Sequence, residues 1–216
     1  RVSIVGKEYL IDHLKMSATP IPRTLAMSAL GDADISIIKT LPGNKKPVIT
    51  KYLDYKDRSQ VVEHLKKEVL GGRQGYIITP MIDESDVMDI SNANEVYENT
   101  KQYFKGICEV GLIHGKLTPS EKEDIMQKFA RNEIQILVAT SVIEVGVNVL
   151  NATNMVILDA DRFGIAQLHQ MRGRVLRSDY QAYCYYRNYI QVSWCESLNK
   201  MHQNNPTCFH TLDCHC

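Results

Sequence analysis

A glutamine and three arginines lie close together near the end of the chain. They are Gln170, Arg172, Arg174 and Arg177, and Gly173 separates the first two arginines. A positively charged side chain can stabilise the charge that spreads over phosphoryl oxygens when a phosphate is hydrolysed. This run could therefore serve phosphate chemistry, and a solvated helix end is the alternative interpretation.

Strand-like and helix-like segments alternate from residue 48 onward, and they must position this run. The periodicity predicts strands at residues 48–53, 76–82, 108–114, 134–140, 155–158 and 182–186, and helices at 58–70, 92–104 and 165–171. A further helix opens at Thr118-Pro-Ser-Glu121, which has the capping-box pattern, and Gly71-Gly72 is expected to end the first helix. This alternation predicts an α/β fold with a parallel sheet and helices on both faces.

Polar or small residues stand where the expected strands end. Thr79, His114-Gly115 and Thr140 each fall at a carboxyl end, where parallel α/β sheets place their working loops. A hydroxyl group or an exposed backbone amide at such an end can bind phosphate without reading sequence. Thr140 could also be a plain strand terminus, and His114 has no companion at metal-ligand spacing.

Composition indicates an ordinary globular protein. The chain has 216 residues, of which 44% are hydrophobic and 23% are charged, as in soluble domains. Lys plus Arg and Asp plus Glu both number 25, so net charge does not point to nucleic acid. No apolar run is long enough to cross a bilayer, and we expect cytoplasmic residence without membrane contact. The Cys and His residues of the last nine positions lack the spacing of a structural zinc site, so we expect no metal there.

Several blocks in order resemble the RecG branch-migrating DNA helicases of superfamily 2. Besides residues 170–177, the blocks that carry the resemblance are residues 17–26, 31–38, 80–85, 139–148 and 162–170. The resemblance implies a RecA-like sheet. It also implies the domain limits: residues 1–45 would be the end of a first RecA-like domain with a linker, 46–190 the second RecA-like helicase domain, and 191–216 a truncated or disordered tail.

The resemblance implies a nucleotide role for five of these residues. Arg174 and Arg177 would be arginine fingers, and Gln170 would link the nucleotide to the acidic motif of the other motor half. Gly146 and Asn148 would approach the ribose. The chain has no phosphate loop and no Asp-Glu carboxylate pair, so we expect ATP and Mg²⁺ to be held mainly by an absent first half, without which this chain is inactive.

The resemblance also implies DNA contacts and a coupling segment. Thr140, His114 and Gly115 would touch the nucleic-acid backbone, and Ser17-Ala18-Thr19 would couple nucleotide state to the position of the two halves. The expected function is that of the C-terminal motor domain of an ATP-dependent DNA helicase. Such an enzyme remodels forked or branched duplex DNA in recombination and repair.

Two positions depart from the family pattern. Asn148 stands where the family carries Asp, and Leu176 stands where it carries Gly. A non-glycine residue disfavours a left-handed backbone at that turn and could misplace Arg177. These departures leave open an alternative, a non-catalytic nucleic-acid-binding or regulatory module with the same fold. An unrelated parallel α/β enzyme is a further alternative, although no nucleophile–base pair is visible in the sequence.

Overall fold

The computed structural model describes residues 46–53, 58–80, 86–140 and 149–187. The predictions for residues 1–45, including Ser17, Ala18 and Thr19, and those for the tail 191–216 lie outside the described residues. No helix in the described part is long and apolar enough to cross a membrane.

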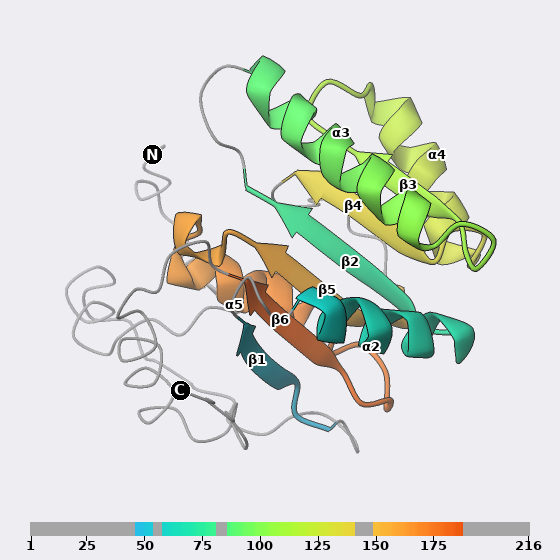
Figure 1. The fold of residues 1–216 in the computed structure, drawn as a ribbon, viewed down its shortest axis with the longest axis vertical. Helices are drawn as coiled ribbons and strands as arrows, with labels where there is room; N and C mark the ends of the chain where they lie inside the picture. The colour runs from blue at the N-terminus through green and yellow to red at the C-terminus, as the bar shows by residue number, and fades with distance from the viewer. Residues whose placement is uncertain (1–45, 54–57, 81–85, 141–148, 188–216) are drawn as a thin grey trace, which may run out of the picture. The chain divides into compact units, whose positions relative to one another are not determined.

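Strands and helices alternate along the described chain (Figure 1). The strands are β1 (Ile49–Leu53), β2 (Gln74–Thr79), β3 (Val110–Ile113), β4 (Ile136–Thr140), β5 (Ala152–Leu158) and β6 (Tyr183–Arg187). The helices are α2 (Arg58–Leu70), α3 (Asp86–Tyr103), α4 (Pro119–Ala130) and α5 (Ile165–Gly173), with a short 3₁₀ helix, η2 (Ala160–Arg162). The predicted elements are therefore confirmed in type, and α2 has the predicted bounds.

The strands form one parallel sheet in the order β1-β6-β5-β2-β4-β3. The chain first moves across the sheet from β1 to β2 and on to β3, and then returns through β4 and β5 to β6. Connections between parallel strands are almost always right-handed. A reversal of direction therefore sends the connecting helices to the other face, so that α2 and α3 cover one face and α4 and α5 the other (Figure 1). The predicted α/β fold with helices on both faces is confirmed.

Each face of the sheet packs its own hydrophobic cluster. On the α4–α5 side, Met126 and Phe129 of α4 and Leu168 of α5 pack against alternate residues of the central strands, such as Leu137. On the α2–α3 side, Leu65 and Val69 of α2 and Phe104 pack with Ile77, Ile136 and Val138. Side chains of neighbouring strand residues point to opposite faces, so one strand such as β4 supplies both clusters.

Two helix ends follow the signals in the sequence. Gly72 has φ of +81° after α2, and its amide and that of Arg73 donate to the carbonyls of Val69 and Glu68, both at 2.9 Å. This is the Schellman arrangement, which glycine favours because a left-handed residue is required. At α4 the Thr118 hydroxyl accepts from the Glu121 amide at 3.3 Å, and the Glu121 carboxylate accepts from the Thr118 amide at 2.8 Å.

A buried glutamine links the start of β2 to α4 and β4. Gln74 is 1% exposed, and its Nε2 donates to the carbonyls of Phe129 at 2.6 Å and Ile134 at 2.7 Å. The sequence predicted the start of this strand at Tyr76, because a glutamine does not look like a strand residue of the core. The structure begins the strand at Gln74, since its amide finds partners that are far away in the sequence.

We expect Gln74→Leu to lower the free energy of unfolding by about 1–3 kcal/mol, because the Phe129 carbonyl and the partly buried Ile134 carbonyl lose their donor, while removal of the unpartnered Gln74 Oε1 offsets part of this loss. Gln102→Leu is the matched control: Gln102 is exposed near the end of α3, and its replacement should change stability by less than about 0.5 kcal/mol. Chemical denaturation of the two variants measures both values. Equal free energies of unfolding in the two variants would show that the hydrogen bonds of Gln74 do not contribute to stability.

Candidate functional site

Three residues chosen from the sequence meet at one edge of the sheet. Thr140 ends β4 and pairs in register with Thr79, which ends β2. On the other side, Ile113 of β3 pairs with Ala139, which places His114 beside Thr140. The predicted carboxyl-end placement of Thr140 and His114 is therefore confirmed. Thr140 and His114 are half-buried, whereas Thr79 is buried and its hydroxyl donates to the Ala139 carbonyl at 3.4 Å.

The His114 imidazole sits in a basic setting. Its Nδ1 is buried and has no hydrogen-bond partner among the described residues. Burial lowers the pKa of His114, and the ammonium groups of Lys122 and Lys116 lower it further, against a smaller opposite effect of Glu121. The ring is therefore neutral near pH 7, where it can serve a ligand only through hydrogen bonding.

Gly115 borders an open stretch of surface. Its φ lies outside the left-handed region, and a Cβ atom built on it meets nothing within 4 Å. The fold of the described residues therefore does not require glycine here, whereas close approach of a ligand to the backbone would. The Lys122 ammonium donates to the Gly115 carbonyl at 3.1 Å, and Lys116 is exposed. Sequence reasoning missed both lysines, because isolated lysines on a helix or turn carry no motif.

The arginine run lies at the far end of α5. Since α5 connects two parallel strands, it starts at the carboxyl end of β5 and leads back to the amino end of β6. Arg174 caps the helix, with its amide donating to Met171 at 3.0 Å. Gln170 is exposed on α5, Arg174 is half-buried and Arg177 is exposed.

The charges of Arg174 and Arg177 both affect the pKa of one buried phenol, that of Tyr76. Burial raises the pKa of Tyr76 to about 12, and both guanidinium groups oppose this rise. The two cations therefore lie within electrostatic reach of one point on β2. The structure thus gathers the two predicted finger residues at the α5 end of the sheet, away from Thr140 and His114. Gly146 and Asn148, the other predicted nucleotide residues, lie outside the described residues.

Arg172 differs from its neighbours. Only 7% of this residue is exposed, so the alternative of a wholly solvated helix end is wrong for it. Burial raises the pKa of Cys184 to about 12 and raises that of Tyr186 well above its usual value, and the Arg172 guanidinium opposes both rises. Arg172 therefore belongs to the packed underside of α5 rather than to an exposed phosphate site.

Leu176 fits the turn in which it stands. Its amide donates to the Gly173 carbonyl at 3.3 Å, and its side chain packs against the α4–α5 cluster. Among the described non-glycine residues, only Asn132 and Asp159 have positive φ, so Leu176 carries no left-handed strain. The departure from the family pattern at Leu176 therefore does not distort the backbone before Arg177.

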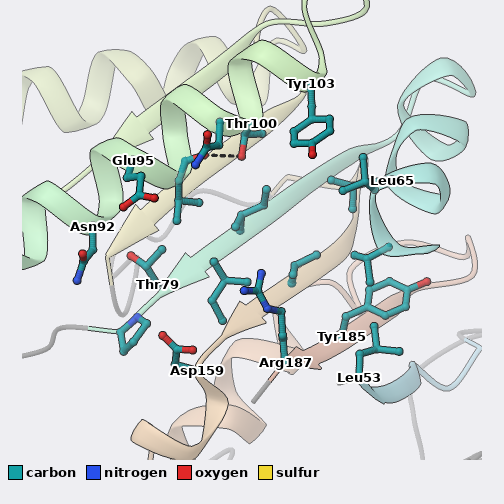
Figure 2. A pocket seen from close by; sticks show the side chains of 18 of the residues that line it. Leu53, Leu65, Thr79, Asn92, Glu95, Thr100, Tyr103, Asp159, Tyr185 and Arg187 are labelled. Atoms are coloured by element: carbon teal, nitrogen blue, oxygen red, sulfur yellow. Dashed lines mark hydrogen bonds between the residues drawn. The ribbon is translucent and has the colours of Figure 1, made fainter. Parts of the chain in front are cut away.

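On the face of the sheet that α2 and α3 cover, opposite to α5, a cleft of about 390 Å³ opens between these two helices (Figure 2). Figure 2 shows Glu95 and Asn92 on the α3 side of its polar end, with Asp159 and Arg187 on the strand side. Burial raises the pKa of the Asp159 carboxyl, and the Arg187 guanidinium opposes this rise. The sequence did not predict this group, because its members come from elements far apart in the chain.

The donor chemistry of the described residues suits anions better than metal ions. Within these residues there is no group of three or more His, Cys, Asp or Glu side chains that could hold a metal. Two guanidinium groups within reach of one point suit the phosphates of a nucleotide.

The three histidines in the described part generate a test of stability against pH. Burial, the largest cause in each case, holds the pKa values of His64, His114 and His169 below the usual 6.5. Below about pH 6.5 the unfolded chain therefore binds protons that the folded chain resists, and the free energy of unfolding must fall as the pH falls. We expect the denaturant concentration at the unfolding midpoint to be lower at about pH 5.5 than at about pH 7.5. The difference between the two pH values should be smaller in His114→Gln. An equal decrease in the variant would contradict the lowered pKa of His114.

Proteins of known type resemble this chain over most of its length. It is 52% identical over 179 residues to the ATP-dependent DNA helicase RecG of Staphylococcus aureus (strain NCTC 8325 / PS 47), which covers 82% of this chain and 26% of that protein. RecG of Bacillus subtilis (strain 168) is 50% identical over 173 residues, which cover 80% of this chain and 25% of that protein. The chain thus spans about a quarter of the length of these relatives, and the predicted resemblance to RecG is confirmed.

Solved structures agree with the fold. A structure of RecG bound to a three-way DNA junction matches 92% of this chain and 27% of that chain, with a TM-score of 0.71 and 34% identity. Domain 2 of the DEAD-box helicase Mss116p, bound to an RNA duplex, shares the fold alone, with a TM-score of 0.51 and 18% identity over 65% of this chain and 54% of that one. The family model described as helicase conserved C-terminal domain matches residues 56–179. With its doubly covered parallel sheet, this chain belongs to the family of helicase conserved C-terminal domains.

Proposed function

We propose that this chain is the C-terminal motor domain of an ATP-dependent DNA helicase of the RecG type, which remodels forked or branched DNA. The observation that carries the proposal is the 52% identity with RecG of Staphylococcus aureus over 179 residues. In this proposal the phosphate loop, and most of the Mg²⁺ ligands, belong to a first motor half. The chain alone would then neither bind ATP tightly nor hydrolyse it.

The proposed nucleotide surface is the end of α5. Arg174 and Arg177 would face the phosphates of ATP, which supplies the hydrolysable phosphoryl group when bound. The electrostatic reach of both cations to Tyr76 supports a shared target. Gln170 is exposed on the same helix, and Gly146 and Asn148 would approach the ribose. Fixed positive charge of this kind lowers the barrier because the protein need not reorganise during the reaction.

The proposed DNA surface is the carboxyl edge of β2, β4 and β3. The Thr140 hydroxyl would donate a hydrogen bond to a DNA phosphate. The Gly115 backbone and the His114 ring would border the path of the same DNA strand. Lys116 and Lys122 add charge to it, as their effect on His114 indicates. None of these groups needs to read a base, which suits a motor that moves along any sequence. A three-way junction is the DNA in the matching RecG structure.

The two surfaces lie toward opposite ends of the strands, and this separation suits a motor. Closure of two halves on ATP at the α5 end would move the DNA edge as a rigid body, because the sheet between them is packed on both faces. Ser17-Ala18-Thr19 would carry the coupling to the first half. A non-catalytic module is the second candidate; Asn148 and the lack of a phosphate loop in this sequence favour it, whereas Leu176 does not, because it fits its turn.

We expect DNA-stimulated ATP hydrolysis when the whole chain is fused to a RecG-type first half. Arg174→Ala in the fusion should lower kcat about 10³-fold or more, the usual contribution of an arginine finger. Arg131→Ala is the matched control, because Arg131 is an exposed arginine at the end of α4, and it should retain turnover. The measurement is steady-state ATP hydrolysis at saturating DNA.

A folded fusion without turnover would contradict the motor proposal. If Asn148→Asp then restored turnover, the loss of the carboxylate would be the cause and the second candidate would stand. Turnover that survives Arg174→Ala would instead exclude this arginine as a finger.

DNA binding offers a second, independent test. The chain alone should bind duplex DNA weakly, with affinity that falls steeply as salt rises. Lys116→Met should reduce the slope of log affinity against log salt by about one, as expected for one lost phosphate contact. Lys105→Met, an exposed lysine at the opposite edge between α3 and β3, should leave the slope unchanged. Equal slopes in the two variants would contradict a DNA path beside His114 and Gly115.

A further inference from the structure

An arginine at the amino edge of the sheet has a fixed backbone. Arg73 follows Gly72 at the end of α2, and its amide donates to the Glu68 carbonyl at 2.9 Å. The next residue, Gln74, begins β2 and is anchored by its buried amide. Hydrogen bonds therefore fix the backbone on both sides of Arg73, and this limits the positions that its guanidinium group can take.

The Arg73 side chain covers an aromatic ring. Its Cζ lies 3.1 Å from the centroid of the Tyr180 ring, and its Nη1 donates to Asn151 Oδ1 at 3.5 Å. Tyr180 is 51% exposed, so one face of its ring is open to solvent or to a neighbouring group. A guanidinium stacks well on an aromatic face because both groups are planar and the ring face is negative.

Tyr180 belongs to the segment that carries the proposed arginine fingers. This segment, residues 174–182, joins α5 to β6, and its helix-type hydrogen bonds end where the Leu176 amide donates to Gly173. Val175, which is 1% exposed, anchors its beginning, and Gln181 Nε2 anchors its end by donating to the Pro47 carbonyl at 2.8 Å. Between these anchors, Tyr180 is three residues from Arg177. The stack on Arg73 therefore ties Tyr180, in the later part of this irregular stretch, to the start of β2.

We propose that Arg73 and Tyr180 form a positioning clamp that holds Arg174 and Arg177 in the place from which they act on ATP. This inference rests on the proposed motor function. An arginine finger is effective when its position is set before the reaction, because the protein then does not pay for ordering it in the transition state. Neither clamp residue touches the nucleotide in this proposal, and Arg73 acts through Tyr180 on the finger segment.

Amide hydrogen exchange of the 216-residue chain tests the clamp without any activity. Tyr180→Leu removes the aromatic face but keeps an apolar side chain. We expect the hydrogen-bonded amides of Arg174, Val175 and Leu176 to exchange roughly two- to fivefold faster, as for loss of an exposed cation–π contact. Tyr180→Phe keeps the ring and should exchange like the parent chain. Arg73→Ala should match Tyr180→Leu, and the double variant should add nothing further. Unchanged exchange in Tyr180→Leu would overturn the clamp.

Kinetics of the fusion with a RecG-type first half tests what the clamp is for. Tyr180→Leu should lower kcat for ATP about three- to tenfold with little change in KM, and Tyr180→Phe should restore it. Faster exchange together with unchanged kcat would overturn the link between the clamp and the arginines. If the unsubstituted fusion has no turnover while the exchange results hold, the proposed motor function fails and the clamp remains only as a structural contact, which overturns its role as a positioning device.

Discussion

The handedness of the connections between parallel strands governs the arrangement of this domain. The chain crosses the sheet in one direction as far as β3 and then returns, so right-handed crossovers must place α2 and α3 on one face and α4 and α5 on the other. The parallel arrangement of β5 and β6 fixes the direction of α5, which runs back toward the amino end of β6. The arginine run at the end of α5 is therefore carried away from the carboxyl edge where Thr140 and His114 lie.

This separation gives the domain two chemically different ends. The carboxyl edge offers a hydroxyl, a neutral imidazole and two lysines around an accessible glycine. The α5 end offers guanidinium groups in a setting that is partly buried, where charge interacts more strongly than in open water. The strands between the two ends are buried on both faces, so a displacement imposed at one end is transmitted by a stiff body rather than absorbed.

Two polar side chains at the amino edge of the sheet have partners that are distant in the sequence. The Gln74 amide nitrogen donates to the carbonyls of Phe129 in α4 and of Ile134 shortly before β4, while Arg73 contacts Asn151 ahead of β5 and Tyr180 ahead of β6. These contacts join the entry points of several strands. Residues 174–182, which carry the proposed arginine fingers, enter the sheet at this same edge.

The sequence by itself determined the elements that depend on local signals. The bounds of α2 follow from helical periodicity and Gly71-Gly72, and the start of α4 follows from the capping box of Thr118 and Glu121, because these interactions close within one helical turn. The motif residues also stood out in the sequence, as did the placement of Thr79, His114 and Thr140 at strand ends.

Only the tertiary structure decided what depends on partners far apart in the chain. It extended β2 to Gln74 and β5 back to Ala152, since Gln74 and the buried Thr153 and Asn154 read as loop residues until the sheet surrounds them. It buried Arg172 while leaving Arg177 exposed, although both stand in one motif. The strand order, the pairing of Arg73 with Tyr180 and the separation of the carboxyl edge from the end of α5 follow from packing across the sheet, and no local pattern of residues encodes packing at that range.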